Sequence, residues 1–365
     1  MSTRRTSRRV RAAGALLLAL SLIAAACGGD DGEEAEPTTT EAPTTSTTGA
    51  TTTTTEAPPV MQLTGLPVGE DELAPLRTAM IVKIDNNNRN ARPQRGLTTA
   101  DVVIEEQVEG RESRFFAVFH SNLTDPVGPV RSARTSDIDL ITMFGRPTFS
   151  SSGGNPGTMG LIRQSDVAIV AGHDSDFGGQ FFRVSNDEGV RRARPHNLFV
   201  NLTELAFAAA GGGTPPPPFA TWRGAGDDLP STAQPTFGAD ITFGQTASRW
   251  VWDEAANGFL RWQQGTPHVD VAGNQVTAAN VLLLMTPYAA SPFDHRSPEA
   301  RSVGAGEGWV LTAGTGTHVT WSRETRDVPY TLTDDDGDVV ALTPGQTWVE
   351  LLPSDPPVWL ESDPR

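Results

Sequence analysis

The sequence predicts a two-domain protein, with an α/β or α+β N-terminal domain at 61–213 and a small, mainly antiparallel β domain at 214–365. Three observations predict it. In 61–213, apolar runs alternate with segments of helical pattern, whereas in 214–365 short apolar and aromatic runs are separated by turn residues. Between the two regions, three glycines at 211–213 and four prolines at 215–218 form the clearest break in the chain.

In the first region, four apolar runs predict strands at 80–84, 102–108, 115–119 and 167–170. Apolar residues spaced for a helix predict helices at 137–144, 157–164 and 201–210. Ser136 or Asp137 can cap the first helix, and Asn201 or Thr203 the last. This alternation of strands and helices is the basis of the α/β prediction.

In the second region, the runs predict strands at 249–252, 259–262, 281–285, 308–312, 318–321 and 347–352. Gly273-Asn274 and Asp336-Gly337 fit the tight turns of hairpins. All eight tryptophans lie in this region. Packing in a core is one interpretation of them, and an exposed platform for sugar rings is the other.

The first 27 residues have the pattern of a targeting segment. Five arginines precede an apolar run at 12–26, which is too short to span a membrane stably and is typical of a signal peptide. Its end, Ala24-Ala25-Ala26-Cys27, resembles a bacterial lipobox, in which Cys27 is diacylated and becomes the mature N-terminus; an ordinary cleavage site is the alternative. We expect an extracytoplasmic protein held on the outer face of the cell membrane by lipid on Cys27. Residues 28–60, rich in Thr, Pro and Glu, predict a disordered tether.

Composition excludes several classes of protein. A single cysteine excludes intrachain disulfides, Cys-cluster metal sites and, if it carries lipid, a cysteine nucleophile. A net charge of −16 argues against a nucleic-acid partner. The acidic turns at 173–176 and 334–338 match no metal template, and no nucleotide-binding or serine-hydrolase motif is present, so we expect neither a metal nor a cofactor.

Arginines near one predicted helix start suggest a ligand site. Arg131, Ser132 and Arg134 come just before Asp137, where free backbone N–H groups favour an anion. Together with Arg92 and Arg114, these arginines would form a cleft for a carboxylate or phosphate. The other candidates for ligand binding are Ser132, Asp137, His196 and Asn197. The alternative is that these arginines make structural ion pairs with acidic residues.

Candidates for acid/base chemistry are fewer. Period-two alternation would place Glu105 and Glu109 on one face of the strand at 102–108, roughly 13 Å apart at the usual rise. That spacing exceeds the carboxylate separation of glycosidases, so either would need another partner. His196, which precedes Asn197, is a candidate general base because an imidazole can take up a proton near neutral pH, although such a histidine can equally anchor its loop.

A series of motifs in order resembles the YerB-like bacterial lipoproteins. These motifs lie at 63–66, 82–86, 91–97, 100–110, 114–115, 128–134 and 195–197, and in the second region at 265–270, 279–281, 304–308, 319–321 and 342–348. The resemblance implies a two-domain extracytoplasmic lipoprotein. It implies no reaction, because the family is a domain of unknown function without established catalytic residues.

Three functions are compatible with the sequence. The leading one is a binding module for an anionic cell-wall ligand, such as a peptidoglycan stem peptide or an anionic envelope polymer. The second is a cell-envelope hydrolase that uses Glu105 or Glu109 with His196. The third is a scaffold that binds another envelope protein through its β domain.

Overall fold

The structure is a computed structural model that describes residues 59–364, except 88, 89 and 354. The predicted signal peptide, Cys27 and most of the predicted tether lie outside the described residues. No helix in the described part is long and apolar enough to cross a membrane. The described residues belong to one compact unit.

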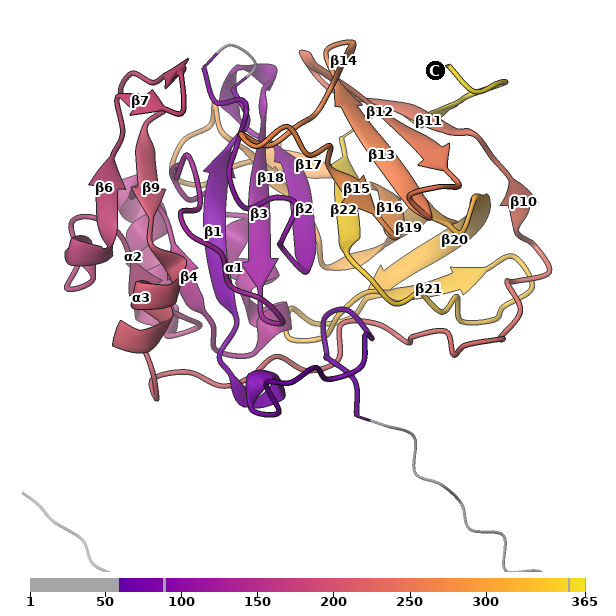
Figure 1. The fold of residues 1–365 in the computed structure, drawn as a ribbon, viewed down its shortest axis with the longest axis horizontal. Coiled ribbons are helices and arrows are strands. Elements are labelled where there is room, and N and C mark those ends of the chain that lie inside the picture. Colours follow the sequence, from indigo (N-terminus) through magenta and orange to yellow (C-terminus); the bar gives the residue numbers. More distant parts are fainter. Residues whose placement is uncertain (1–58, 88–89, 354, 365) are drawn as a thin grey trace, which may run out of the picture. The chain divides into compact units, whose positions relative to one another are not determined.

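The N-terminal region contains the predicted strands and helices, together with several short strands that the pattern did not predict (Figure 1). In chain order it consists of η1 (Ala74–Leu76), β1 (Met80–Asp85), β2 (Val102–Gln107), η2 (Glu109–Arg111), β3 (Ser113–Phe119), α1 (Asp137–Ile141), η3 (Thr142–Phe144), β4 (Thr148–Ser150), α2 (Pro156–Ser165), β5 (Ile169–Ala171), η4 (Gly178–Gln180), β6 (Phe181–Arg183), β7 (Asn186–Asp187), β8 (Val190–Arg191), β9 (Leu198–Val200) and α3 (Leu202–Ala208).

The C-terminal region is built from strands, in agreement with the predicted fold class. They are β10 (Gln234–Pro235), β11 (Gly238–Phe243), β12 (Thr246–Asp253), β13 (Gly258–Gln263), β14 (Thr266–Pro267), β15 (Thr277–Ala278), β16 (Asn280–Met285), β17 (Tyr288–Ala290), β18 (Pro298–Ala300), β19 (Gly304–Thr312), β20 (Thr315–Arg323), β21 (Thr331–Asp334), β22 (Thr347–Leu352) and β23 (Val358–Trp359). The predicted turns at 273–274 and 336–337 lie in hairpins, closed by bridges between Val269 and Gln275 and between Thr333 and Val339.

One large sheet runs through both regions. Among the described residues its order is β10-β20-β19-β16-β22-β2-β3-β1-β4-β5, and β21 pairs with β20. The two regions join where β2 pairs in parallel with β22, in a register that places Glu105 opposite Glu350. The N-terminal part is mixed, because β3 is antiparallel to β1 and β2 while β4 and β5 continue parallel to β1.

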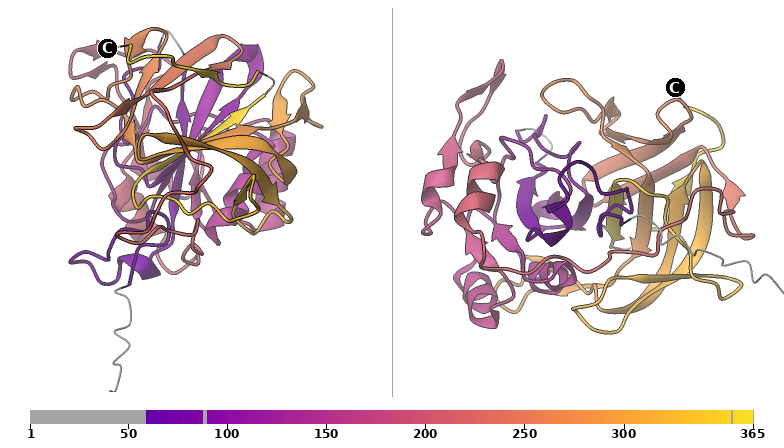
Figure 2. Two further views of the ribbon diagram at one scale, coloured as in Figure 1. Left: turned by 90° about the vertical axis from the view of Figure 1, so that its right-hand side faces the viewer. Right: turned by 60° about the horizontal axis from the view of Figure 1, so that its bottom comes forward.

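Each face of this sheet has its own core. On one face, Ile104 and Phe116 pack with Ile141 of α1 and with Ile162 of α2. On the other face, Val103 and Phe115 pack with α3, β9 and a second sheet of order β14-β13-β12-β11-β23. Figure 2 (right) shows the indigo N-terminal strands between the magenta helices and the yellow C-terminal strands.

The tryptophans divide between core and surface. Trp250, Trp321 and Trp348 are fully buried, as expected if they fill the core. Trp359 keeps 38% of its surface exposed and Trp309 is half-buried. Neither interpretation of the tryptophans therefore holds for all eight.

Candidate anion-binding site

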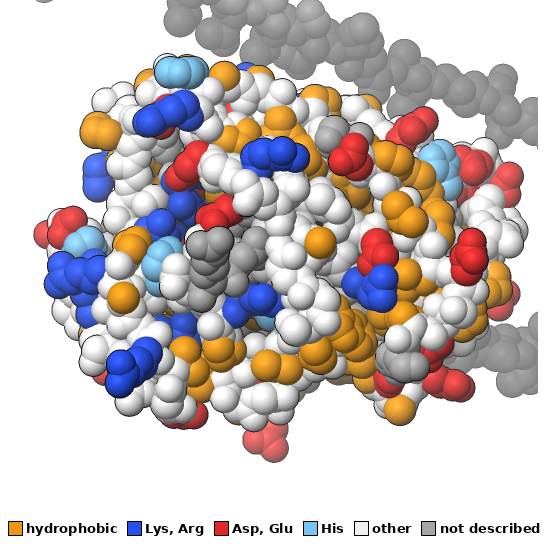
Figure 3. All heavy atoms as spheres, turned by 90° about the horizontal axis from the view of Figure 1, so that it is seen from above, with side chains coloured by type: hydrophobic (Ala, Val, Ile, Leu, Met, Phe, Trp, Pro, Cys, Tyr) orange, Lys and Arg blue, Asp and Glu red, His pale blue; other side chains and the backbone are white. Residues whose placement is uncertain are grey.

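The candidate site lies where the carboxyl end of β1 meets loops of the N-terminal domain. The segment 127–131 runs beside this strand end, and the Asp85 N–H donates to Pro129 O at 2.8 Å. Gly128 has φ +153°, and a Cβ there would lie 2.8 Å from the Phe199 ring, so glycine is required for the segment to approach β9 this closely. Basic, acidic and histidine side chains gather on the face of the molecule seen in Figure 3.

The centre of the site is the carboxylate of Asp85, which is 2% exposed. Its Oδ2 lies 2.5 Å from His196 Nδ1 and 3.2 Å from Arg131 Nε. Burial alone would raise the pKa of Asp85, but the hydrogen bond from His196 and the positive charges of Arg131 and Arg114 hold that pKa below its ordinary value. Asp85 is therefore a buried anion that orients two cationic or titratable side chains.

Arg131 and His196 each have donors left over for a ligand. Their side chains are 19% and 14% exposed. Within the described part of the chain, no hydrogen bond reaches the Nη atoms of Arg131 or Nε2 of His196. A guanidinium fork beside an imidazole fits the oxygens of a carboxylate or phosphate. With Nδ1 held by Asp85, Nε2 of His196 donates to an anion when the imidazole is protonated and accepts a proton when the imidazole is neutral.

Arg114 and Arg134 lie in the same cluster but are bound to Glu109. Arg134 Nε lies 2.7 Å from Glu109 Oε2, and Arg114 Nη2 lies 3.4 Å from Oε1. Arg114 Nη1 also donates to Ser132 O at 3.0 Å. Burial, reinforced by the charge of Arg134, lowers the pKa of Arg114 to about 10, so it stays protonated at neutral pH. These two arginines make the structural ion pairs that were the alternative to ligand binding.

Arg92 does not join this cluster. Its Nη1 donates to Gln263 O on β13 at 3.1 Å, a bond between the two domains. Burial and the charge of Arg261 lower the pKa of Arg92. The structure thus brings together three of the four arginines expected in the cleft, and among these three only the Nη atoms of Arg131 have no hydrogen bond to a described residue.

The remaining predicted ligand-binding residues bind other parts of the protein. Asp137 is fully buried; its Oδ1 lies 2.8 Å from Lys83 Nζ, and its Oδ2 accepts from Arg134 N at 2.6 Å. α1 has five residues, and the carboxylate of Asp137 already lies at its start, so the backbone N–H groups of this helix add nothing to the candidate site. Asn197 Oδ1 accepts from Arg183 Nη1 at 2.9 Å, and Ser132 Oγ lies 3.4 Å from the Ser152 hydroxyl.

The glutamates of β2 are structural. Glu105 and its neighbour Glu106 point to opposite faces of the sheet, and both are fully buried. Glu105 Oε2 lies 2.5 Å from Arg261 Nη2, and Glu106 is bound to Lys83 Nζ. The strand ends before Glu109, which lies in η2, so the expected shared face with Glu105 is wrong. An external substrate cannot reach Glu105.

Sequence reasoning missed Asp85 as the partner of His196. The available signal was a charged residue at the end of the apolar run at 80–84. It also missed Glu350, opposite Glu105 on β22; burial and the charge of Glu105 hold the pKa of Glu350 well above its ordinary value. No group of three metal-ligating side chains occurs within 59–364, leaving out 88, 89 and 354.

Comparison with known proteins agrees with this two-part architecture. Residues 63–214 match the "Protein of unknown function (DUF3048) N-terminal domain" and residues 239–349 match the corresponding C-terminal domain. The chain belongs to the DUF3048 family. A relative in Bacillus subtilis (strain 168), named "Putative lipoprotein YerB", is 28% identical over 297 residues, which is 80% of this chain and 85% of that protein.

The fold of this DUF3048 protein is also seen in a solved structure. The crystal structure of the YerB protein from Bacillus subtilis superposes with a TM-score of 0.69 at 24% identity, covering 81% of this chain and 97% of that one. The resemblance to YerB-like proteins inferred from the motifs is confirmed.

Proposed function

We propose that this protein is a lipid-anchored extracytoplasmic envelope protein whose N-terminal domain binds a carboxylate or phosphate group of a cell-wall polymer. The observation that carries the proposal is the arrangement around Asp85: one buried carboxylate orients both Arg131 and His196, and no hydrogen bond from a described residue occupies their outer nitrogens. A guanidinium and a protonated imidazole that are fixed before the ligand arrives lower the ordering cost of binding an anion.

The location rests on separate support. The arginines and apolar run before Cys27 have the pattern of a lipoprotein signal, and the relative in Bacillus subtilis carries a lipoprotein name. Lipid on Cys27 and the tether at 28–60 would keep the folded domains near the outer face of the cell membrane. Peptidoglycan stem peptides supply carboxylates there, and anionic envelope polymers supply carboxylates or phosphates.

Co-sedimentation with purified sacculi tests the binding function. The full-length chain, kept in detergent, is mixed with sacculi that retain their anionic polymers and with sacculi stripped of them. We expect binding that Arg131→Ala weakens at least tenfold and that Arg163→Ala, at an exposed arginine on α2, leaves unchanged. Loss of binding on stripping identifies the anionic polymer; retained binding identifies the stem-peptide carboxylate. Equal binding by Arg131→Ala and the native chain would refute the proposal.

A hydrolase is the second candidate, and the hydrogen bond between Asp85 and His196 favours it. In that function Asp85 would orient the imidazole, and Nε2 would take a proton from a water that attacks the bound polymer. Glu105 cannot serve as this base because it is buried against Arg261. Mass spectrometry of the supernatant tests this function. Fragments that are released by the native chain but not by His196→Gln would favour a hydrolase over a protein that only binds the polymer.

A further inference from the structure

A second concave surface lies on the C-terminal domain, away from the residues of the anion site. It is a groove of about 760 Å³ between the edge of the large sheet, formed by β10 and β20, and the edge strand β23 of the second sheet. Its size is within the usual range of pockets for small ligands. Nothing in the proposed anion binding uses this groove.

Aromatic rings form one wall of the groove. Phe237 and Trp359 are 47% and 38% exposed, and the Trp309 ring centroid lies 6.1 Å from that of Trp359. A Cβ at Gly316 would lie 3.3 Å from the Trp359 ring, so this glycine lets the indole lie directly against the backbone of β20. The rings are therefore held in place by the fold itself, which leaves a preformed apolar surface open to solvent.

Polar side chains line the rest of the groove. His318 Nδ1 lies 2.7 Å from Asp335 Oδ1, and the His318 ring packs edge-on against Trp309, with centroids 5.4 Å apart. Gln234 and Glu361 add an amide and a carboxylate. Among the described residues that line the groove there is no lysine or arginine. Such a lining repels a polyanion and offers acceptors to hydroxyl groups.

We propose that this groove binds an uncharged stretch of a glycan chain. A pyranose ring has an apolar face of C–H groups, which fits an exposed indole, and a rim of hydroxyls, which fits carboxylate, amide and imidazole groups. In the groove the sugar face would lie on Trp359, and the hydroxyls would bond to Asp335 and His318. A cationic peptide is the competing occupant, because the carboxylates and rings would also attract ammonium groups.

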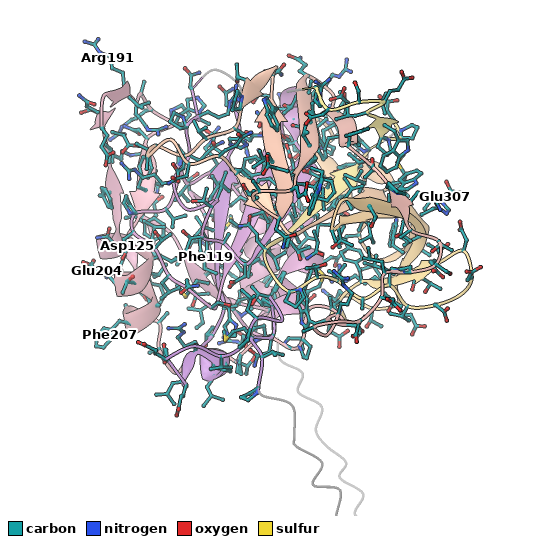
Figure 4. The ribbon with its side chains drawn as sticks, turned by 45° about the vertical axis from the view of Figure 1, so that its right-hand side comes forward. Phe119, Asp125, Arg191, Glu204, Phe207 and Glu307 are labelled. Carbon is teal, nitrogen blue, oxygen red and sulfur yellow. The ribbon has the colours of Figure 1, made fainter. Side chains whose placement is uncertain are left out.

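Isothermal titration calorimetry of the full-length chain in detergent tests this site. The probes are a β-1,4-linked hexamer of N-acetylglucosamine, a β-1,4-linked glucose hexamer and hexalysine. We expect heat of binding with at least one saccharide, an affinity at least tenfold lower in Trp359→Ala, and no change in Phe207→Ala. Phe207 is the matched control because it is 87% exposed on α3, on the opposite side of the molecule from Glu307 of β19 (Figure 4).

Two further variants separate the possible outcomes. Phe237→Ala repeats the test at another exposed ring, in case Trp359→Ala alters the fold, and circular dichroism checks each variant. Arg131→Ala should bind the saccharide normally, so failure of this proposal and failure of the anion site are distinguishable. The proposal is overturned if neither saccharide binds, if only hexalysine binds, or if both aromatic variants bind the saccharide as the native chain does.

Discussion

Arg261→Met tests whether a buried ion pair holds the two domains together. Arg261, on β13, is fully buried, and its Nη2 lies 2.5 Å from Glu105 Oε2 on β2. The guanidinium also lies over three aromatic rings, at 5.4, 5.7 and 5.1 Å from their centroids; these belong to Phe115, Trp250 and Trp348. Its removal takes away the cation that pairs with Glu105 and leaves this charge buried beside Ser113, Asn86 and the carboxyl group of Glu350.

The expected cost follows from that environment. Removing one member of a buried ion pair destabilises a protein by about 3–5 kcal/mol, because the other charge is left without compensation. Methionine keeps an unbranched apolar side chain in the site, which limits the added cost of a cavity. We therefore expect the free energy of unfolding to fall by about 3–5 kcal/mol.

Unfolding of the full-length chain in guanidinium chloride, monitored by circular dichroism, measures this change in the free energy of unfolding. Arg249→Met is the matched control, because Arg249 pairs with Asp240 at the surface, where the two side chains are 38% and 39% exposed. Surface ion pairs of this kind contribute less than about 1 kcal/mol to the free energy of unfolding. Glu105→Gln combined with Arg261→Met should recover part of the loss. A cost below about 1 kcal/mol for Arg261→Met alone would refute the reasoning.

The other predictions concern charges on the N-terminal side. Lys83→Met should destabilise the protein by about 3–5 kcal/mol, because Glu106 and Asp137 would then be buried together without their cation; a loss in unfolding free energy below about 1 kcal/mol would contradict this. Burial raises the pKa of Asp101 to about 6, so its contribution to stability is complete below about pH 4 and is lost as the pH rises through 6. Asp101→Asn, whose amide oxygen can still accept from Ser121 N, should remove that decline in unfolding midpoint. The pKa of Asp85 is lowered, so its contribution to the free energy of unfolding is complete above about pH 4 and is lost at lower pH. In Asp85→Asn the free energy of unfolding should therefore fall less steeply as the pH drops below about 4. An equally steep fall in the variant and in the native chain would contradict this.

Local sequence pattern predicted the strands that are long and apolar, and missed those that depend on neighbours. β1 and β22 are buried along their whole length, so each appears in the sequence as an uninterrupted apolar or nearly apolar run. β4 and β9 have three residues each, too few to show a period, and are held by pairing with β1 and β6. The parallel pairing of β2 with β22 joins segments far apart in the chain, and no local pattern records it.

The same limit explains the site. Arg131 and His196 stood out as polar residues in loops, whereas Asp85 lies 111 positions before His196 and could be recognised as its partner only in three dimensions. Glu105 suggested catalysis because a carboxylate on an apolar strand is unusual. Its compensating cation, Arg261, comes from the other domain, 156 positions away.

The division of the arginines limits what the proposed anion site could recognise. Glu109 binds Arg114 and Arg134, and Asp137 accepts from the backbone of Arg134, so these cations stabilise the loop that carries Arg131. The guanidinium of Arg131 and the imidazole of His196 remain to contact a ligand. Two such groups can bind a single anionic group but not a series of charges along a polymer. Affinity for a polymer would then require a second contact, and the aromatic groove of the C-terminal domain supplies one of different chemistry. Two proposed sites on one compact unit would act as a bivalent binder, so disabling either should reduce retention on sacculi by more than its own affinity for a small probe indicates.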